Sequence, residues 1–107
     1  MATQVEIGSA GERIVANELV GKGWKTNVDT KGPGSTDIEA RGANGSGLLV
    51  QVKTAMSPSQ PVSLSSDEER NIKSRATKLG WAAYEAKVQV DGSLRLIGSV
   101  MWRKLNS

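Results

Sequence analysis

Apolar and polar residues recur along this chain with two different periods. Residues 9–21 follow the helical period of about 3.6, and residues 65–79 follow it again. Ser9 is the predicted N-cap of the first helix. Ser65 or Ser66 is the predicted N-cap of the second helix, because a glutamate follows each serine by three residues, as in a capping box. A glycine after each segment predicts where the helix ends.

The remaining segments alternate with the period of two that is typical of β-strands. A Gly-rich stretch around Asn44 and Gly45 predicts a tight hairpin turn between two of them. The predicted order is therefore α-β-β-β-α-β-β, and a length of 107 residues predicts a single domain spanning residues 1–107. The expected strands are residues 24–28, 36–41, 48–55, 81–90 and 94–102.

Composition narrows the possible chemistry. The chain has no cysteine and no histidine, which excludes disulfides, thiolate or imidazole metal ligands, and Cys or Ser-His catalysis. The net charge of +3 suits a polyanion such as nucleic acid. The N-terminus has no basic-plus-apolar signal, and no apolar run approaches about 18 residues. We therefore expect a cytoplasmic protein that does not act at a membrane.

Four residues form a candidate catalytic site. Glu12 lies in the first predicted helix, Asp37 in the second strand, and Gln51 and Lys53 in the third. A turn centred on residues 44 and 45 would pair positions that sum to about 89, which brings Asp37 within cross-strand reach of Gln51 and Lys53. Carboxylate and amide oxygens gathered in this way are typical of a magnesium site.

Each of these residues also has a purely structural interpretation. Glu12 would be a first-turn glutamate near the positive end of its helix. Asp37 would close the preceding loop as an Asx-turn residue. Gln51 and Lys53 would line the solvated side of an amphipathic strand.

Phosphodiester hydrolysis requires such a cluster, because a divalent metal polarises the phosphoryl oxygens and activates a water molecule. We predict Mg²⁺ as the cofactor, with Mn²⁺ able to substitute. The predicted ligands are Asp37, the amide oxygen of Gln51, the backbone carbonyl of Val52, and Glu12 directly or through a water. Lys53 would orient the attacking water or stabilise the phosphorane. Because Gln51 is neutral, we expect one weakly held metal.

These residues resemble the PD-(D/E)xK nuclease superfamily, whose restriction-endonuclease-like fold has an αβββαβ core. The segments 34–40 (Gly-Ser-Thr-Asp-Ile-Glu-Ala) and 49–53 (Leu-Val-Gln-Val-Lys) look like its signature. Residues 11–13 (Gly-Glu-Arg) look like the opening of the archaeal-type Holliday-junction resolvases. The resemblance implies an α/β fold with a mixed central sheet flanked by two helices, and it implies catalytic roles for Glu12, Asp37, Gln51 and Lys53. Gln51 in place of an acid is similar to the QxK motif of Mrr-like nucleases.

The partners implied are DNA and a second copy of the chain. A homodimer would place two sites to cut opposing strands, with Trp81, Met101 and Trp102 as candidate interface residues. The basic helix 65–79 would contact phosphates, although its charges are also typical of a solvated helix face. The predicted DNA-binding residues are Arg13, Lys25, Lys31, Ser35, Thr54, Arg70, Lys73 and Arg75.

The sequence therefore favours a Mg²⁺-dependent endodeoxyribonuclease, with branched DNA such as the Holliday junction as the expected substrate. One alternative is an Mrr-like restriction-type nuclease. Another is a catalytically inactive DNA-binding module of the same fold, for which Gln51 is the main support. A third is a small structural protein with an unrelated fold, which would neither bind DNA nor respond to metal.

Overall fold

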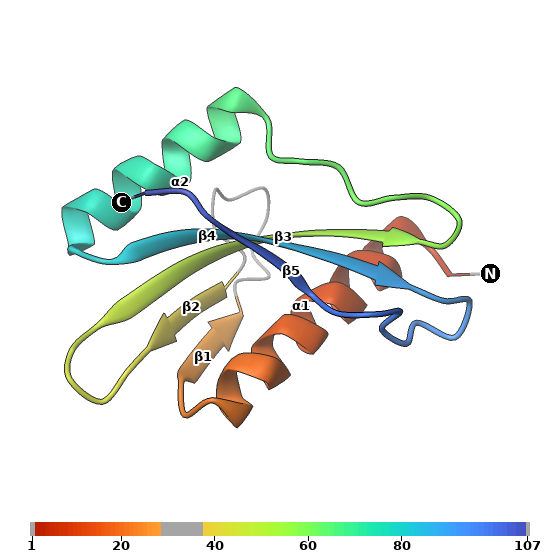
Figure 1. Cartoon of the computed structure of the whole chain (residues 1–107), viewed down its shortest axis with the longest axis horizontal. Coiled ribbons are helices and arrows are strands. Elements are labelled where there is room, and N and C mark those ends of the chain that lie inside the picture. Colours follow the sequence, from red (N-terminus) through yellow and green to blue (C-terminus); the bar gives the residue numbers. More distant parts are fainter. Residues whose placement is uncertain (1, 29–37, 107) are drawn as a thin grey trace.

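The computed structural model describes residues 2–28 and 38–106. The order of elements predicted from the sequence is confirmed (Figure 1). Within the described ranges, no helix combines the length and the apolar character needed to cross a membrane. The elements are α1 (Gln4–Gly21), β1 (Lys25–Val28), β2 (Ile38–Arg41), β3 (Gly47–Met56), α2 (Ser66–Leu79), β4 (Ala82–Val90) and β5 (Met101–Lys104).

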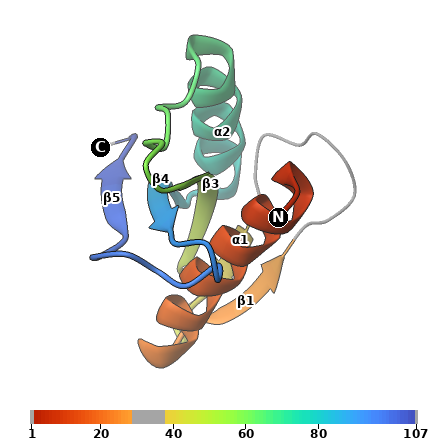
Figure 2. The ribbon, with the colours of Figure 1, turned by 90° about the vertical axis from the view of Figure 1, so that its right-hand side faces the viewer.

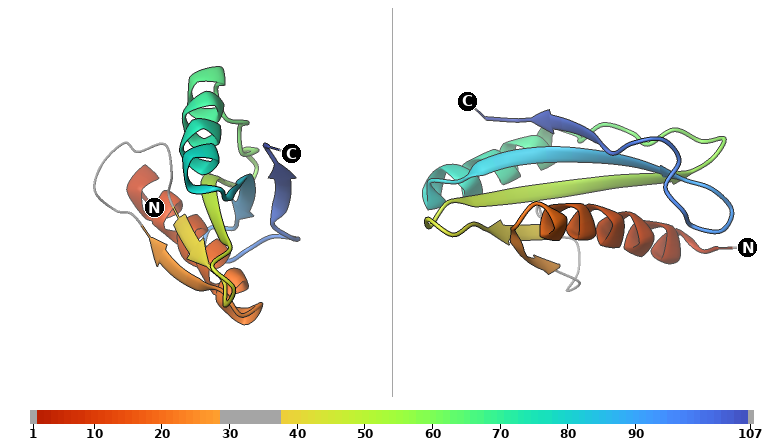
Figure 3. Two further views of the ribbon diagram at one scale, coloured as in Figure 1. Left: turned by 90° about the vertical axis from the view of Figure 1, so that its left-hand side faces the viewer. Right: turned by 60° about the horizontal axis from the view of Figure 1, so that its bottom comes forward.

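The described strands form one mixed sheet in the order β1-β2-β3-β4-β5. The central strands β3 and β4 are parallel, and the other neighbours are antiparallel. A parallel pair needs a crossover connection, and α2 supplies it between β3 and β4. The right panel of Figure 3 shows these two long strands side by side along the molecule.

The two helices cover opposite faces of the sheet, as Figures 1 and 2 show. Helix α1 packs on the face that carries Val50 and Val52. Helix α2 packs on the face that carries Leu49. Successive residues of a strand point to opposite faces, so Gln51 and Lys53 lie on the same face as Leu49. This arrangement confirms the predicted α/β fold with a mixed sheet flanked by two helices.

The start of α1 differs from the prediction. The helix begins at Gln4 rather than near Ser9, and Thr3 is its N-cap. The Thr3 side chain accepts from the Glu6 amide while the Glu6 carboxylate accepts from the Thr3 amide. This capping box satisfies two amides at the helix end, so Ser9 lies inside the helix. In contrast, α2 begins and ends as predicted, with Ser65 as N-cap and the left-handed Gly80 after Leu79.

The hairpin between β2 and β3 has a register one residue away from the prediction. Arg41 pairs with Gly47, and Gly42 donates to the Ser46 carbonyl, so the loop has three residues. Its last residue, Gly45, has a φ of +75°. A three-residue loop of this kind ends with a left-handed residue, for which glycine is the least strained choice. Consequently Ile38 pairs with Val50.

The last strand also differs from the predicted residues 94–102. Strand β5 begins at Met101, and the preceding segment makes only an isolated bridge between Leu96 and Val90 among the described residues. Gly98 has a φ of +69°, a conformation outside the extended region of a strand. The segment between β4 and β5 is therefore an irregular connection.

Candidate functional site

Gln51 lies in the middle of β3, on the face that α2 covers. Its side chain is buried, with 5% of the residue exposed. Its Oε1 atom has no hydrogen-bond partner within the described part of the chain. Leaving a buried acceptor unsatisfied costs about 1–3 kcal/mol, and the atom is therefore a candidate ligand for an incoming cation or hydrogen-bond donor. The alternative that Gln51 lines a solvated strand face is wrong, because both faces of the sheet carry a helix.

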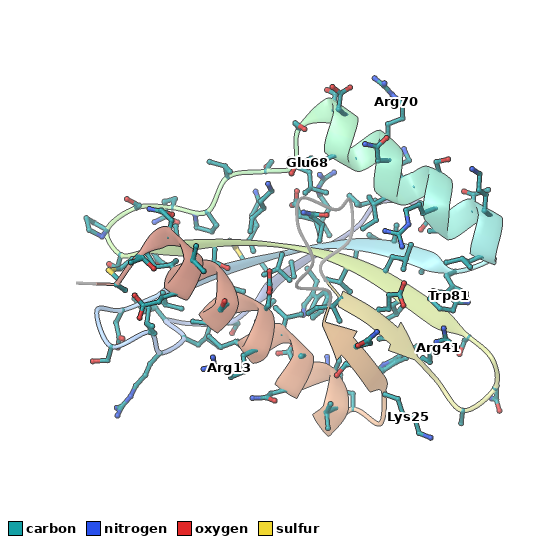
Figure 4. The ribbon with its side chains drawn as sticks, turned by 180° about the vertical axis from the view of Figure 1, so that it is seen from behind. Arg13, Lys25, Arg41, Glu68, Arg70 and Trp81 are labelled. Carbon is teal, nitrogen blue, oxygen red and sulfur yellow. The ribbon has the colours of Figure 1, made fainter. Side chains whose placement is uncertain are left out.

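Lys53 follows Gln51 on the same face and contacts α2. Its Nζ atom donates to Glu68 Oε2 at 2.8 Å. Glu68 is also the N3 residue of the capping box of α2, since its Oε1 accepts from the Ser65 amide at 2.9 Å. The hydrogen bond from Lys53, followed by the one from the Ser65 backbone, lowers the pKa of the Glu68 carboxyl. Glu68 therefore holds the lysine from a fixed position on the helix. Figure 4 shows Glu68 at the start of α2.

From the sequence, Glu68 is predicted only to be a capping residue. Its capping-box spacing was visible, but no sequence signal connected it to Lys53, which lies fifteen positions earlier. The two residues meet because α2 folds back over β3 after the connecting loop.

Glu12 lies on α1, which packs against the other face of the sheet. It is half-buried, and it follows Gly11. A side chain at Gly11 would overlap Thr54, so the helix backbone lies directly against β3 at the residue after Lys53. The structure therefore brings the backbone at Glu12 close to the end of β3 that carries Lys53. The other predicted carboxylate, Asp37, lies outside the described residues.

Val52 was predicted to offer its backbone carbonyl to the metal. It lies inside β3 opposite Ala86 of β4, and its side chain belongs to the core beneath α1. Within the described residues, no group of three or more acidic side chains is placed to hold a metal. Among the predicted ligands, Gln51 offers a buried side-chain oxygen that has no hydrogen-bond partner in the described residues.

A second carboxylate, Glu85, lies beside Gln51 on β4, and sequence reasoning did not single it out. Gln51 pairs with Glu85 across the parallel strands, and Glu85 is 1% exposed. It accepts from the Leu64 amide at 2.9 Å and from Nε and Nη2 of Arg103 at 3.2 and 3.1 Å. Arg103 Nη2 also donates to Glu69 Oε1 at 3.0 Å.

Burial alone would raise the pKa of Glu85, but the hydrogen bonds from Arg103 and from the Leu64 amide outweigh it and lower that pKa. The same contacts with Glu85 and Glu69 raise the pKa of Arg103. This network ties β4, β5 and α2 together. Glu85 is therefore fully engaged in structure, and it does not replace the carboxylate missing at Gln51.

The predicted DNA-binding residues of α2 lie on two different sides of the helix. Arg70 and Lys73 line a shallow groove of about 740 Å³ on the side that carries Glu69. Both are paired with acids of their own helix: Arg70 with Asp67 at 3.3 Å and Lys73 with Glu69 at 3.9 Å, as the helical spacing predicted for Lys73.

Arg75 lies on the other side of α2. Its Nη2 atom is 3.5 Å from Glu39 Oε1 of β2. This side also carries Glu68, so it is the side of α2 that faces Lys53. The structure therefore separates Arg75 from Arg70 and Lys73.

The remaining predicted DNA contacts are distributed over the molecule. Arg13 on α1 and Lys25 on β1 are exposed (Figure 4). Thr54 is half-buried beneath Gly11, so the structure gives it a packing role between β3 and α1. Lys31 and Ser35 lie outside the described residues.

The candidate interface residues also differ from one another. Trp102 is half-buried and donates from Nε1 to Glu18 at 2.7 Å, and its ring packs edge-on against Tyr84. Trp81 packs on Gly47, where a side chain would overlap its indole ring. Met101 is 56% exposed. Two of the three residues therefore have packing roles within the chain.

No protein-family model matches this chain, and no curated protein matches it in sequence. Its structure is similar to that of Hjc from Archaeoglobus fulgidus, a Holliday junction resolvase from an archaeal hyperthermophile. The TM-score is 0.71 and the sequence identity is 23%, over 92% of this chain and 72% of that chain. The chain has the fold of this resolvase. The similarity extends over nearly all elements, so it confirms the predicted fold class.

Proposed function

We propose that this protein is a metal-dependent endonuclease that hydrolyses DNA phosphodiesters, with branched DNA such as a Holliday junction as its substrate. One observation carries the proposal. Oε1 of Gln51 is buried, has no hydrogen-bond partner among residues 2–28 and 38–106, and lies two residues from Lys53 on one strand face. An amide oxygen beside a lysine fits a site that receives a cation and a phosphate, and the fold is that of a protein described as a resolvase.

Gln51 and Asp37 would hold the metal, with Glu12 binding it directly or through water and the Val52 carbonyl as a further oxygen donor. Mg²⁺ is the expected ion, and Mn²⁺ would substitute for it. A divalent ion bound there supplies charge to polarise the phosphoryl oxygens and to make a bound water more acidic. The neutral Gln51 leaves Asp37 and Glu12 as the two negative charges, which suits one ion.

Lys53 would act on the phosphate. Its ammonium group lies on the face that Gln51 shares, and Glu68 fixes it at 2.8 Å. In the reaction a water oxygen forms a bond to phosphorus, the bond to one bridging oxygen breaks, and negative charge builds on the phosphoryl oxygens. A positioned ammonium group stabilises that charge. Lys53 would also orient the attacking water.

A symmetric homodimer is part of this proposal, because two sites related by a two-fold axis can cut opposing strands. The exposed Met101 is the interface candidate that remains available in the folded chain. The cytoplasmic location expected from the sequence is also part of the proposal.

A second candidate is a DNA-binding module of the same fold that does not cut. The observation that favours it is the pairing of Lys53 with Glu68, together with a neutral residue at position 51. In such a protein the lysine would serve as a structural ion pair. An Mrr-like restriction-type nuclease would use the same residues on a linear duplex.

The test is cleavage of labelled four-way junction, flap, linear duplex and single-stranded DNA of matched sequence, with Mg²⁺, Mn²⁺ or EDTA. We expect metal-dependent symmetric nicks at the junction, and we expect Asp37→Ala and Lys53→Ala to abolish them while sparing DNA binding. Cutting of linear duplex alone would indicate the restriction-type activity. Binding without cutting in either metal would indicate the inactive module, and cutting that survives Asp37→Ala would contradict the site assignment.

A further inference from the structure

An exposed surface of the sheet lies on the same face as Gln51 and Lys53. Helix α2 packs on β3 and β4 of the described strands. On β2, Ile38 and Ala40 are buried in the core beneath α1, so Glu39 and Arg41 point to the other face. No described helix packs its backbone on this face of β1 and β2; the Arg75 side chain of α2 reaches Glu39 there, and Arg41 is exposed.

Two basic side chains stand together on this surface. Lys25 of β1 pairs directly with Arg41 of β2, and directly opposite residues point to the same face. Both are exposed, and neither makes an ion pair with an acid among the described residues. Figure 4 shows Arg41 beside Trp81 near the end of α2, and Lys25 farther from that helix at the start of β1.

The guanidinium group of Arg41 packs over an aromatic ring. Its guanidinium carbon lies 5.5 Å from the centroid of the Trp81 ring. That ring lies on Gly47, the residue that pairs with Arg41 across the hairpin, and a side chain at Gly47 would displace it. A guanidinium stacked on an indole keeps its outward N–H groups available for an oxygen ligand.

This surface is a better candidate for binding phosphate than the groove on α2 that Arg70 and Lys73 line. Those two cations lie on the far side of the helix and are compensated by Asp67 and Glu69. Lys25 and Arg41 instead lie on the face of the candidate site. Arg75 forms an ion pair with Glu39, so these two charges offset each other and Lys25 and Arg41 leave this surface with a net positive charge.

We propose that Lys25 and Arg41, backed by Trp81, form a basic platform that binds the phosphate backbone of a DNA duplex arm leading into the candidate site. This inference rests on the proposed function. Gly47, which pairs with Arg41, lies four residues before Gln51 on β3. The distance along the strand between these two residues is roughly 14 Å. DNA advances by about 3.4 Å per nucleotide of one strand, so the platform contacts phosphates about four nucleotides from the reacting bond.

The platform reads no base sequence. An ammonium and a guanidinium on an exposed sheet surface match phosphate oxygens, and such contacts position a duplex without specifying its sequence. Arg41 is a positioning residue that nothing in the sequence pattern had marked, because its role depends on Trp81 forty residues later.

The test measures binding without metal, so it does not depend on cleavage. The double variant Lys25→Ala/Arg41→Ala is compared with the control Arg95→Ala/Lys104→Ala. The control removes the same charge from exposed cations of the β4–β5 connection and of β5, at the other edge of the sheet. The probes are a labelled four-way junction and a duplex of one of its arms, titrated in EDTA from about 50 to 200 mM salt.

We expect the platform variant to bind both probes at least tenfold more weakly at the lowest salt, with a slope of log K against log salt that is less steep by about 1.8, for two phosphate contacts. The control should match the wild-type protein within twofold. Arg41→Lys keeps the charge and should keep the slope, which separates charge loss from misfolding. Unfolding midpoints verify that all variants are folded.

An unchanged slope in the platform variant, or an equal loss in the control, overturns the platform. Wild-type protein that binds neither probe also overturns it. Protein that binds through Lys25 and Arg41 but does not cut with Mg²⁺ or Mn²⁺ supports the platform and contradicts the proposed nuclease activity, so the two failures are distinguishable.

Discussion

Lys53 Nζ donates a 2.8 Å hydrogen bond to Glu68 Oε2, which links the lysine of the candidate site to the first turn of α2. Glu68 is anchored at its other oxygen by the Ser65 amide. Both side chains are partly shielded, at 23% and 35% exposure. The pair therefore has a defined geometry. The residue that pairs with Lys53 also belongs to the capping box of α2.

Glu68→Gln tests whether this pair positions Lys53. Glutamine preserves the capping box, because it also serves at the N3 position. It replaces a charge-assisted hydrogen bond by a neutral one about half as strong. We expect kcat for DNA cleavage to fall about fivefold, equivalent to about 1 kcal/mol, while DNA affinity stays the same or rises because an acid is lost. Single-turnover rates and binding titrations measure the two effects.

The matched control for this variant is Glu69→Gln. Glu69 is the next residue of α2 and pairs with Arg103 and Lys73 on the other side of the helix. Its replacement should leave the cleavage rate within twofold. A cleavage rate for Glu68→Gln equal to that of Glu69→Gln would show that the Lys53 pair is only structural.

Gln51→Glu tests the ligand role of residue 51. It places a negative charge at the buried position whose Oε1 has no described partner. One added charge about 4 Å from an ion is worth up to ~4 kcal/mol at a surface-like dielectric. We expect at least a tenfold lower Mg²⁺ concentration for half-maximal cleavage and a larger Mg²⁺-induced rise in Tm.

The control, Gln89→Glu, introduces the same change on β4, where the Gln89 side chain donates to the Ser59 carbonyl. It should leave the Mg²⁺ titration unaltered. If Gln51→Glu also leaves both the titration and the Tm shift unaltered, Gln51 is not a ligand.

Gly11→Ala tests the close approach of α1 to β3. The new methyl group would overlap Thr54, and forced overpacking costs about 1–3 kcal/mol even though alanine favours the helix. Gly8→Ala is the control, because a Cβ at Gly8 meets nothing within 4 Å. We expect that control to stabilise the protein by about 0.8–1 kcal/mol.

Urea unfolding measures both variants. Because Gly11 is next to Glu12, Gly11→Ala is also expected to lower cleavage, while Gly8→Ala should not. Equal stability of the two variants would contradict the packing of Gly11 on Thr54.

Glu85→Gln tests the buried network and its pH dependence. The pKa of Glu85 in the folded state is below its ordinary value of 4.5. Its carboxylate therefore stabilises the fold above about pH 4.5, and this contribution is lost as the pH falls through the lower folded-state pKa. We expect Glu85→Gln to lower the free energy of unfolding by about 1–3 kcal/mol at pH 7.

The difference between wild-type protein and Glu85→Gln should begin to shrink as the pH falls below about 4.5, where Glu85 of the unfolded chain takes up a proton, and should disappear below the lowered folded-state pKa. Urea unfolding of both proteins at pH 7 and at about pH 3 measures this change. A difference that stays constant with pH would indicate that the charge of Glu85 does not contribute.

Much of the secondary structure could be read from local patterns. Ser65 and Glu68 mark the start of α2 within four residues, and Gly80 marks its end. The start of α1 was misplaced because Gly8, Ser9 and Gly11 resemble a helix boundary. Gly11 is in the helix for a tertiary reason, its contact with Thr54, which local propensity does not encode.

In the hairpin between β2 and β3, the predicted turn is present, but the strand register differs from the predicted one by one residue. Asn44 and Gly45 do lie in the turn, but the loop has three residues rather than two. That difference decides which residues pair across β2 and β3, and Ile38 stands opposite Val50 as a result.

By itself, the sequence determined the order of elements, the alternation that puts Gln51 and Lys53 on one strand face, and the residue types available for chemistry. Only the tertiary structure decided what covers that face. The placement of α2 buried Gln51, gave Lys53 the partner Glu68, and divided Arg75 from Arg70 and Lys73. Caps and alternation act over a few neighbouring residues, whereas burial and ion pairing depend on segments that are far apart in the chain and meet only on folding.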